Sequence, residues 1–278
     1  MSETAYRRSP RLTRRGRLLL LLFALLLSAG VVLVLVLRET GAPVRTLLIP
    51  EGWRATQVYA AVDKRLDLPP GTTRRAAATA DLKLPAEAKG NPEGYLFPAT
   101  YPITDDTTPG GLLAYMVETA TKRFGQDHIA DGARRAGLTV YQLVTMAGIV
   151  QAEADTPADM GKVARVIRNR LAHGMPLQMD STLNYALNRS TLATTTGDTR
   201  IDSPYNTYER KGLPPTPIGN PGQEAVDAAI NPPPGTWLYF VTVAPGDTRF
   251  TDNYAQHRLN VSEFNENRRS HKETDGAG

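Results

Sequence analysis

The chain has 278 residues, of which 41% are hydrophobic and 22% are charged, a composition that excludes wholesale disorder. It contains no cysteine, which excludes a disulfide scaffold, a thiol nucleophile and a cysteine-ligated metal site. The net charge of +4 is not a nucleic-acid signature, because residues 1–17 carry +5 and residues 18–278 carry −1. We therefore expect no nucleic-acid partner.

The N-terminal segment predicts a membrane anchor. Residues 18–37 contain no charged side chain and consist almost entirely of Leu, Val, Ala and Phe. As a helix they would span about 30 Å, the thickness of a bilayer's hydrocarbon core. Six arginines precede this run, so the positive-inside rule places residues 1–17 in the cytoplasm and the rest of the chain outside. A cleaved signal peptide is the alternative, and it fits less well because no small-x-small cleavage site follows the long apolar run.

A small module is predicted between the membrane and the main domain. Residues 44–49 predict a strand, and residues 54–66 predict a helix from the spacing of their apolar side chains. Residues 69–92 are rich in Pro, Ala and Lys without a clear period, which predicts a linker. Such a module is either LysM-like or a lid on the next domain.

The helix predicted over 141–153 carries the candidate catalytic acid. Met146, Ile149 and Val150 line one face, and Glu153 follows on the same face. A glutamate at a helix end usually points into water. Among apolar neighbours, however, a carboxyl group loses hydration, its pKa rises, and it can hold a proton near neutral pH. A general acid that protonates a glycosidic oxygen needs this property.

A second helix is predicted over 158–172, with Asp155 or Thr156 as its cap. Asn169 and Arg170 lie near its end, where a solvated helix terminus is the alternative to a functional role. Further along, eight of the 21 prolines fall within 204–234, which predicts a rigid loop. The Tyr, Asn and Thr side chains beside this loop suit a sugar chain, and a purely structural loop is the alternative. A buried strand is predicted over 237–243.

Several short motifs occur in a fixed order between residues 93 and 264. They are EGYLFP (93–98), TY (100–101), GIVQAE (148–153), NRL (169–171), GMPLQ (174–178), DST (180–182), the block 205–222, AINP (229–232), LYFV (238–241) and Phe250. This ordered set resembles the MltG (YceG-like) family of endolytic murein transglycosylases. The chain departs from the family pattern at Gln151, where members often have Glu, and at Thr248, where members commonly have His.

The resemblance implies an α+β fold with a defined domain order. A cytoplasmic basic tail (1–17) and one transmembrane helix (18–37) would precede a small LysM-like membrane-proximal module with its linker (38–90). A YceG-like catalytic domain would follow over 91–264, and a flexible C-terminal tail over 265–278. The protein would then be a single-pass protein of a bacterial plasma membrane with its catalytic domain outside.

The resemblance also implies a reaction. Glu153 would protonate the leaving oxygen of the β-1,4 bond between N-acetylmuramic acid and N-acetylglucosamine in nascent peptidoglycan strands. The muramyl C6 hydroxyl would then attack C1, leave a 1,6-anhydro end and terminate strand elongation. No metal or cofactor is expected. Penicillin-binding proteins and other wall synthases are further partners that the resemblance suggests. The expected substrate-binding residues are Asn169, Gln178, Asp180, Thr182, Tyr205, Asn206, Thr207 and Tyr208.

Two other functions stay open at this point. A muramidase hydrolase normally needs a second carboxylate about 5–9.5 Å from the acid, and Asp155 and Asp180 are the candidates. A glycan-binding scaffold that positions wall synthases would leave Glu153 inert.

Overall fold

The structure is a computed structural model that describes residues 45–190 and 194–275. The chain divides into two units, Met1–Arg45 and Thr46–Gly278, and the elements below belong to the second unit apart from the first residue of strand β1. The predicted basic tail and membrane span lie outside the described residues. Among the helices that are described, none is both long and apolar enough to cross a bilayer.

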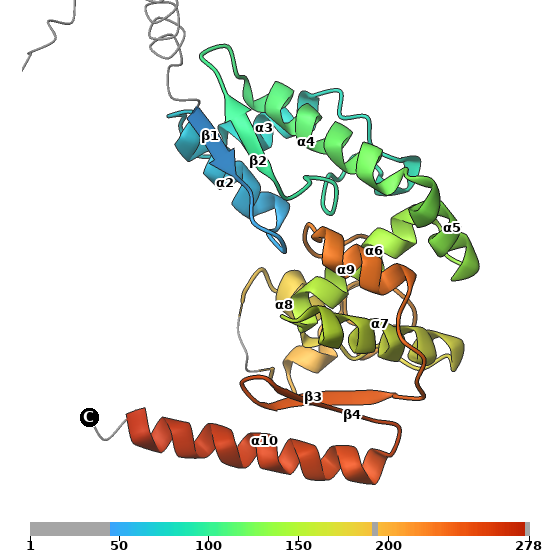
Figure 1. Ribbon diagram of the computed structural model, residues 1–278. Coiled ribbons are helices and arrows are strands. Elements are labelled where there is room, and N and C mark those ends of the chain that lie inside the picture. The colour runs from blue at the N-terminus through green and yellow to red at the C-terminus, as the bar shows by residue number, and fades with distance from the viewer. Residues whose placement is uncertain (1–44, 191–193, 276–278) are drawn as a thin grey trace, which may run out of the picture. The chain divides into compact units, whose positions relative to one another are not determined.

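The first elements of the described chain are two paired strands and a helix (Figure 1). Strand β1 (Arg45–Leu48) pairs with β2 (Thr100–Ile103), and helix α2 (Ala55–Arg65) follows β1. The strand and the helix predicted for this region are therefore confirmed. Because β2 lies beyond residue 90, the predicted module boundary falls between two strands that pair with each other.

The predicted linker over 69–92 is wrong, because it contains helix α3 (Thr72–Thr79). The buried Asp63 carboxylate accepts hydrogen bonds from the backbone N–H groups of Gly71 and Thr73, both at 2.7 Å. These bonds satisfy donors at the start of α3 that have no partner within the helix. Since Asp63 lies in the preceding helix, the local composition of the segment gave no sign of this support.

The centre of the fold is α6 (Val140–Glu153), which packs against α7 (Pro157–Ala172) and α9 (Gln223–Ile230). Between its second and eleventh residues, α6 is buried everywhere except at Gln142. It therefore lacks the polar face of a surface helix. The Thr156 hydroxyl accepts the Asp159 N–H at 3.2 Å and caps α7. Both helices predicted here are confirmed. The elements between β1 and α6 not yet named are η1 (Ala86–Ala88), α4 (Pro109–Phe124) and α5 (Asp127–Arg135).

The C-terminal elements are a hairpin and a long helix (Figure 1). Strand β3 (Tyr239–Ala244) pairs antiparallel with β4 (Asp247–Thr251), and α10 (Tyr254–Asp275) packs against both strands. The buried strand predicted over 237–243 is instead mostly half-exposed, because this sheet has two strands and only Val243 of β3 is buried. The elements between α7 and β3, besides α9, are α8 (Asp180–Ala186) and η2 (Asp198–Arg200).

Helix α10 extends through Asp275, so the segment predicted as a flexible tail from residue 265 is helical up to that point. Its contacts with the hairpin are polar as well as apolar. Asn260 is buried, the Asn267 amide donates to the Val243 carbonyl oxygen at 2.9 Å, and Glu263 pairs with Arg249. These contacts hold α10 against one face of the hairpin.

The described elements form a mixed fold of helices with two two-stranded sheets, which confirms the α+β class at that level. The LysM-like character of the membrane-proximal part stays a prediction.

Candidate active site

Glu153 is the last residue of α6, and the residue is half-buried. The helix that carries it is enclosed by α7 and α9, so the position of Glu153 is fixed by packing along the whole of α6. The chain leaves the helix at once, because Ala154 is extended. The predicted acid therefore lies where a rigid core helix ends at a partly open surface.

Helix α8 supplies the hydrogen bonds to this carboxyl group. The Ser181 hydroxyl donates to Glu153 Oε1 at 2.6 Å, and the Ser181 backbone N–H lies 3.3 Å from the same oxygen. Oε2 accepts no hydrogen bond from the described residues. One carboxyl oxygen is thus fixed, and the other is left for a different partner.

The surroundings raise the pKa of Glu153 above its ordinary value. Burial is the main cause, because the charged form loses hydration, and the negative charge of Asp180 adds to it. The two hydrogen bonds from Ser181 act in the opposite direction, since they favour the charged form. Burial prevails, so the carboxyl group keeps its proton to a higher pH than an ordinary glutamate does.

Asp180 and Tyr208 form a hydrogen-bonded pair in the same groove as Glu153. The Tyr208 hydroxyl donates to Asp180 Oδ1 at 2.5 Å. Burial raises the pKa of Tyr208, and its hydrogen bond to Asp180 and the charge of Asp180 raise it further. Tyr208 therefore stays protonated at neutral pH and donates to Asp180.

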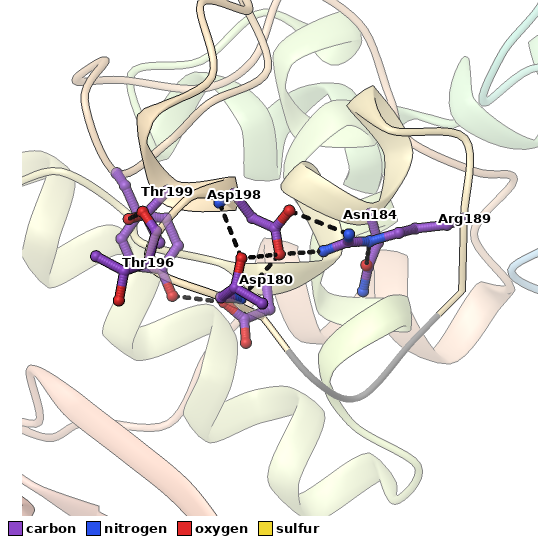
Figure 2. A network of polar contacts seen from close by, with 8 residues as sticks. Asp180, Asn184, Arg189, Thr196, Asp198 and Thr199 are labelled. Carbon is purple, nitrogen blue, oxygen red and sulfur yellow. Dashed lines mark hydrogen bonds and ion pairs between the residues drawn. The ribbon is translucent and has the colours of Figure 1, made fainter.

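A second polar cluster fixes α8 at its other end (Figure 2). Arg189 pairs with both carboxylate oxygens of Asp198, at 2.6 and 3.1 Å, and donates from Nε to Asn184 at 3.2 Å. The Arg54 guanidinium donates to the Arg189 carbonyl oxygen at 2.9 Å. The segment after α8 is thus tied both to α8 itself and to the start of α2.

Glu153 opens into a groove of about 810 Å³. Acidic side chains come from α6 and α8, while β3 and α10 supply aromatic and basic ones. The lining residues are Glu153, Arg170, Gln178, Met179, Asp180, Tyr208, Tyr239, Phe240, Val241, Thr242, Tyr254, His257, Arg258, Val261, Ser262, Phe264 and Asn265. A groove of this size with aromatic and polar walls can hold sugar rings.

Of the eight predicted substrate-binding residues, Gln178, Asp180 and Tyr208 line this groove with Glu153. Gln178 has a positive φ of 50° and donates its backbone N–H to the Thr207 carbonyl oxygen at 2.9 Å. These three side chains are placed where a substrate in the groove would meet them.

Three others are buried supports of the groove wall. Thr182, Asn206 and Thr207 are almost fully buried. The Thr207 hydroxyl accepts the Met179 N–H at 3.0 Å and lies 2.9 Å from the Thr182 hydroxyl. The Asn206 amide donates to backbone carbonyl oxygens at residues 199 and 201. They hold the loop that carries Tyr208 against the start of α8.

Tyr205 and Asn169 lie outside the groove lining. The Tyr205 hydroxyl is 2.8 Å from the Thr216 hydroxyl, and its ring packs against Tyr185. The Asn169 amide donates to the carbonyl oxygens of Gly235 and Trp237, so it holds the segment that leads into β3.

The structure adds residues that the sequence interpretation did not select. Ser181 contacts the Glu153 carboxyl group directly, whereas the sequence predicts roles only for its neighbours Asp180 and Thr182. Arg170 is not at a solvated helix end, because its side chain is buried and lines the groove. His257 and Arg258 reach the groove from α10. No helix is predicted from the sequence for the segment that carries them, because its composition is predominantly polar.

The remaining sequence observations have structural places. The Gln151 amide oxygen accepts the Gly222 N–H at 2.9 Å, an interaction that a glutamate could also make. The Thr248 hydroxyl lies 3.0 Å from the Thr242 hydroxyl across the hairpin. Asp155 is exposed and does not line the groove. Within 45–190 and 194–275, no group of three or more His, Asp or Glu side chains is placed to hold a metal ion.

Comparisons with known proteins point to one family. A model of the YceG-like family matches residues 28–263. The chain is 39% identical over 166 residues to the endolytic murein transglycosylase of Bacillus subtilis, covering 59% of this chain and 46% of the relative. It is 37% identical over 177 residues to that of Streptococcus pneumoniae strain D39, covering 62% of this chain and 32% of the relative. The match therefore spans less than half the length of these curated relatives.

A solved structure agrees in fold. The crystal structure of a YceG-like protein from Listeria monocytogenes superposes with a TM-score of 0.68 at 29% identity, over 80% of this chain and 77% of that one.

Proposed function

Because the chain belongs to the YceG-like family, we propose that it is an endolytic murein transglycosylase of the bacterial cell wall. Its substrate would be the glycan strand of peptidoglycan, cut at the β-1,4 bond between N-acetylmuramic acid and N-acetylglucosamine. Two curated relatives that carry this name support the proposal. The observation that carries it is the partly buried Glu153, whose pKa is raised and whose Oε2 has no partner among the described residues.

The geometry supports a mechanism in which Glu153 acts twice. Ser181 donates to Oε1, so the proton of the neutral carboxyl group sits on Oε2. Transfer of this proton to the glycosidic oxygen breaks the bond between that oxygen and muramyl C1. The resulting carboxylate takes the proton of the muramyl C6 hydroxyl while its oxygen attacks C1. A 1,6-anhydro ring forms, the acid regains its proton, and no water is consumed.

The intramolecular attack explains why one acid suffices. The C6 hydroxyl is part of the same sugar as C1, so its effective concentration exceeds that of a diffusing water. A muramidase hydrolase is the second candidate, and Asp180 is the observation that favours it, because this carboxylate lines the same groove.

Product analysis tests both candidates. The full-length protein in detergent micelles is incubated with purified wall, and the released fragments are examined by mass spectrometry. Anhydro ends are lighter than hydrolysed ends by one water and resist borohydride reduction. Reducible muramic ends as the main product would establish the hydrolase instead. No release by the wild-type protein, with strands still bound, would favour the glycan-binding scaffold.

We further propose that residues 18–37 anchor the protein in the plasma membrane, with 1–17 in the cytoplasm and 38–278 outside. The arginine cluster before the apolar run supports this orientation, and a wall substrate requires it. A reporter that is active only in the cytoplasm, fused after Gly278, should be silent. Strong cytoplasmic signal would overturn the orientation. On the outer side of the membrane, penicillin-binding proteins and other wall synthases are the expected protein partners. Cutting nascent glycan strands there would end the elongation of these strands.

A further inference from the structure

The groove carries opposite charges on its two sides. Glu153 and Asp180 belong to α6 and α8, whereas Arg170, His257 and Arg258 come from α7 and α10. Burial and the charge of Arg170 lower the pKa of His257, so the cationic groups of the basic side are the two arginines.

Arg170 is a buried cation without a counter-ion. Only 6% of the residue is exposed. Its Nε donates to the Leu238 carbonyl oxygen and its Nη1 to the Leu177 carbonyl oxygen, both at 2.6 Å. Among the described residues, Nη2 has no hydrogen-bond partner and no carboxylate forms an ion pair with Arg170. The Tyr239 ring also faces this guanidinium, with its centroid 5.3 Å from Cζ. Neutral carbonyl groups and an aromatic ring compensate a buried charge only in part, so a guanidinium in this state favours an anion.

Arg258 is likewise unpaired in the part of the chain that the structure describes. Its side chain is exposed on α10 and lines the same groove. Arg249 on the neighbouring hairpin behaves differently, because it pairs with Asp247 and Glu263. The charge of Arg249 is thus neutralised within the protein, whereas the charges of Arg170 and Arg258 in the groove are left for a ligand.

A glycan strand offers such an anion at every second sugar. Both sugars of the strand are themselves uncharged, but muramic acid carries a D-lactyl ether that ends in a carboxylate or in a peptide with carboxylates. A carboxylate would be repelled by Asp180 and attracted by Arg170 and Arg258.

We propose, on the basis of the proposed function, that Arg170 and Arg258 bind a carboxylate carried through the lactyl group of muramic acid and thereby set the register of the strand. N-acetylglucosamine has no such substituent. A strand shifted by one sugar would therefore place an uncharged hydroxyl beside the two arginines. The register with the muramyl group on the basic side is favoured, which selects one of the two alternating β-1,4 bonds for Glu153.

Binding is measured separately from cleavage. Full-length protein with the Glu153→Gln change is titrated in detergent micelles with labelled, uncrosslinked strands. Four strand types are compared: strands with stem peptides, strands stripped to the free lactyl carboxylate, and each of these after carbodiimide coupling to methylamine, which neutralises the carboxylates. Arg258→Glu is placed in this background, with Arg258→Lys as the charge-preserving variant and the exposed Arg135→Ala on α5 as control.

Arg258→Glu should weaken binding of carboxylated strands roughly tenfold at low salt, and less at high salt. Neutralised strands should bind both proteins equally, and Arg258→Lys should recover most of the loss. A loss confined to peptide-bearing strands identifies the stem peptide as the source of the anion, and a loss on both carboxylated types identifies the lactyl carboxylate. No loss, or the same loss on neutralised strands, would overturn the inference. Arg170→Lys, tested if it folds, should show the same charge dependence.

The proposed function is judged by a separate result. If the wild-type protein cleaves no strand while the charge-dependent binding is found, the proposed function fails and the carboxylate site stands. If the wild-type protein cleaves and Arg258→Glu changes nothing, the carboxylate site fails alone.

Discussion

Helix α8 contacts a glutamate near each of its ends, and the two glutamates differ in what their second oxygen can reach. Near the start of α8, Ser181 binds one oxygen of Glu153, and the other faces no described partner. Near the end of α8, the Tyr185 hydroxyl donates to Oε2 of Glu93 at 3.1 Å, while Oε1 accepts the Ala55 N–H at 2.9 Å. Glu93 is only 3% exposed, whereas Glu153 opens into the groove.

Burial raises the pKa of both carboxyl groups, and it brings that of Glu93 to about 7. A raised pKa is therefore not what distinguishes the candidate acid Glu153 from Glu93. Glu93 closes the N-terminus of α2 and ties it to α8, so both of its oxygens serve the fold. Glu153 has one oxygen held and one open, which is what proton transfer to a substrate requires.

The largest expected effect separates the two glutamates by activity. Glu153→Gln keeps the shape of the side chain but removes the transferable proton, so cleavage of purified wall should fall by about 10²- to 10⁴-fold. Glu93→Gln should retain activity within about tenfold of wild type, because Glu93 does not line the groove and transfers no proton to the substrate. Circular dichroism checks that each variant is folded, and the exposed Glu118→Gln on α4 is the matched control. Near-normal cleavage by Glu153→Gln would assign the acid to another residue.

The second prediction concerns stability and its dependence on pH. Glu93 releases its proton near pH 4.5 when unfolded and at about pH 7 when folded. Between these values the unfolded chain binds fewer protons, so stability falls as pH rises, by an amount on the order of 3 kcal/mol. Glu93→Gln has no proton to release and should lack this slope.

Thermal unfolding from pH 5 to pH 8 tests this prediction. The Tm of the wild type should fall relative to the Tm of Glu93→Gln as pH rises. Parallel curves for the two proteins would mean that Glu93 is already ionised at pH 5. The charge of Arg54 and the two hydrogen bonds to Glu93, which lower its pKa, would then outweigh the effect of burial, which raises it.

A smaller effect is expected at Ser181. Ser181→Ala removes the hydroxyl that fixes Oε1, a bond worth about 1 kcal/mol, so kcat should fall roughly fivefold. The same hydrogen bond favours the charged carboxylate, so its loss should raise the pKa of Glu153 further and move the alkaline limb of the pH profile upward. Ser181→Thr, which keeps a hydroxyl, should restore most of the activity. If kcat falls but the alkaline limb of the pH profile stays in place, Ser181 orients the Glu153 carboxyl group without changing its pKa.

The elements that local patterns predicted are those whose support is local. Apolar periodicity and a cap at Thr156 were enough for α6 and α7, and the position of Glu153 at the end of an apolar face was enough to select it as the candidate acid. Helix α3 escaped prediction because Asp63 in the preceding helix stabilises its start.

The partners of the site could not be predicted in the same way. Arg170 at a helix end normally reaches water, and here it is buried because it meets the carbonyl oxygens of Leu177 and Leu238. Side-chain contacts with backbone outside the helix itself leave no periodic signal. The predicted substrate-binding residues Thr182, Asn206 and Thr207 lie next to the groove. Their hydrogen bonds point the side chains into the groove wall and away from the groove itself.

The smallest expected effect also decides between the two reactions. If Glu153 alone serves as acid and base, Asp180 acts on it only through charge, which helps to raise the pKa of Glu153. Asp180→Asn removes this charge, yet the amide oxygen can still accept the Tyr208 hydroxyl. The pKa of Glu153 should fall, and the alkaline limb of activity should move to lower pH, opposite to the shift expected for Ser181→Ala. Activity at the optimum should drop less than about threefold, because no reacting proton passes through Asp180. Asp155→Asn, at an exposed position outside the groove, is the control.

In a hydrolase, by contrast, Asp180 would be the second carboxylate, and its loss would abolish cleavage as completely as the loss of Glu153. The pH profile of Asp180→Asn thus tests whether this groove works with one carboxyl group or with two.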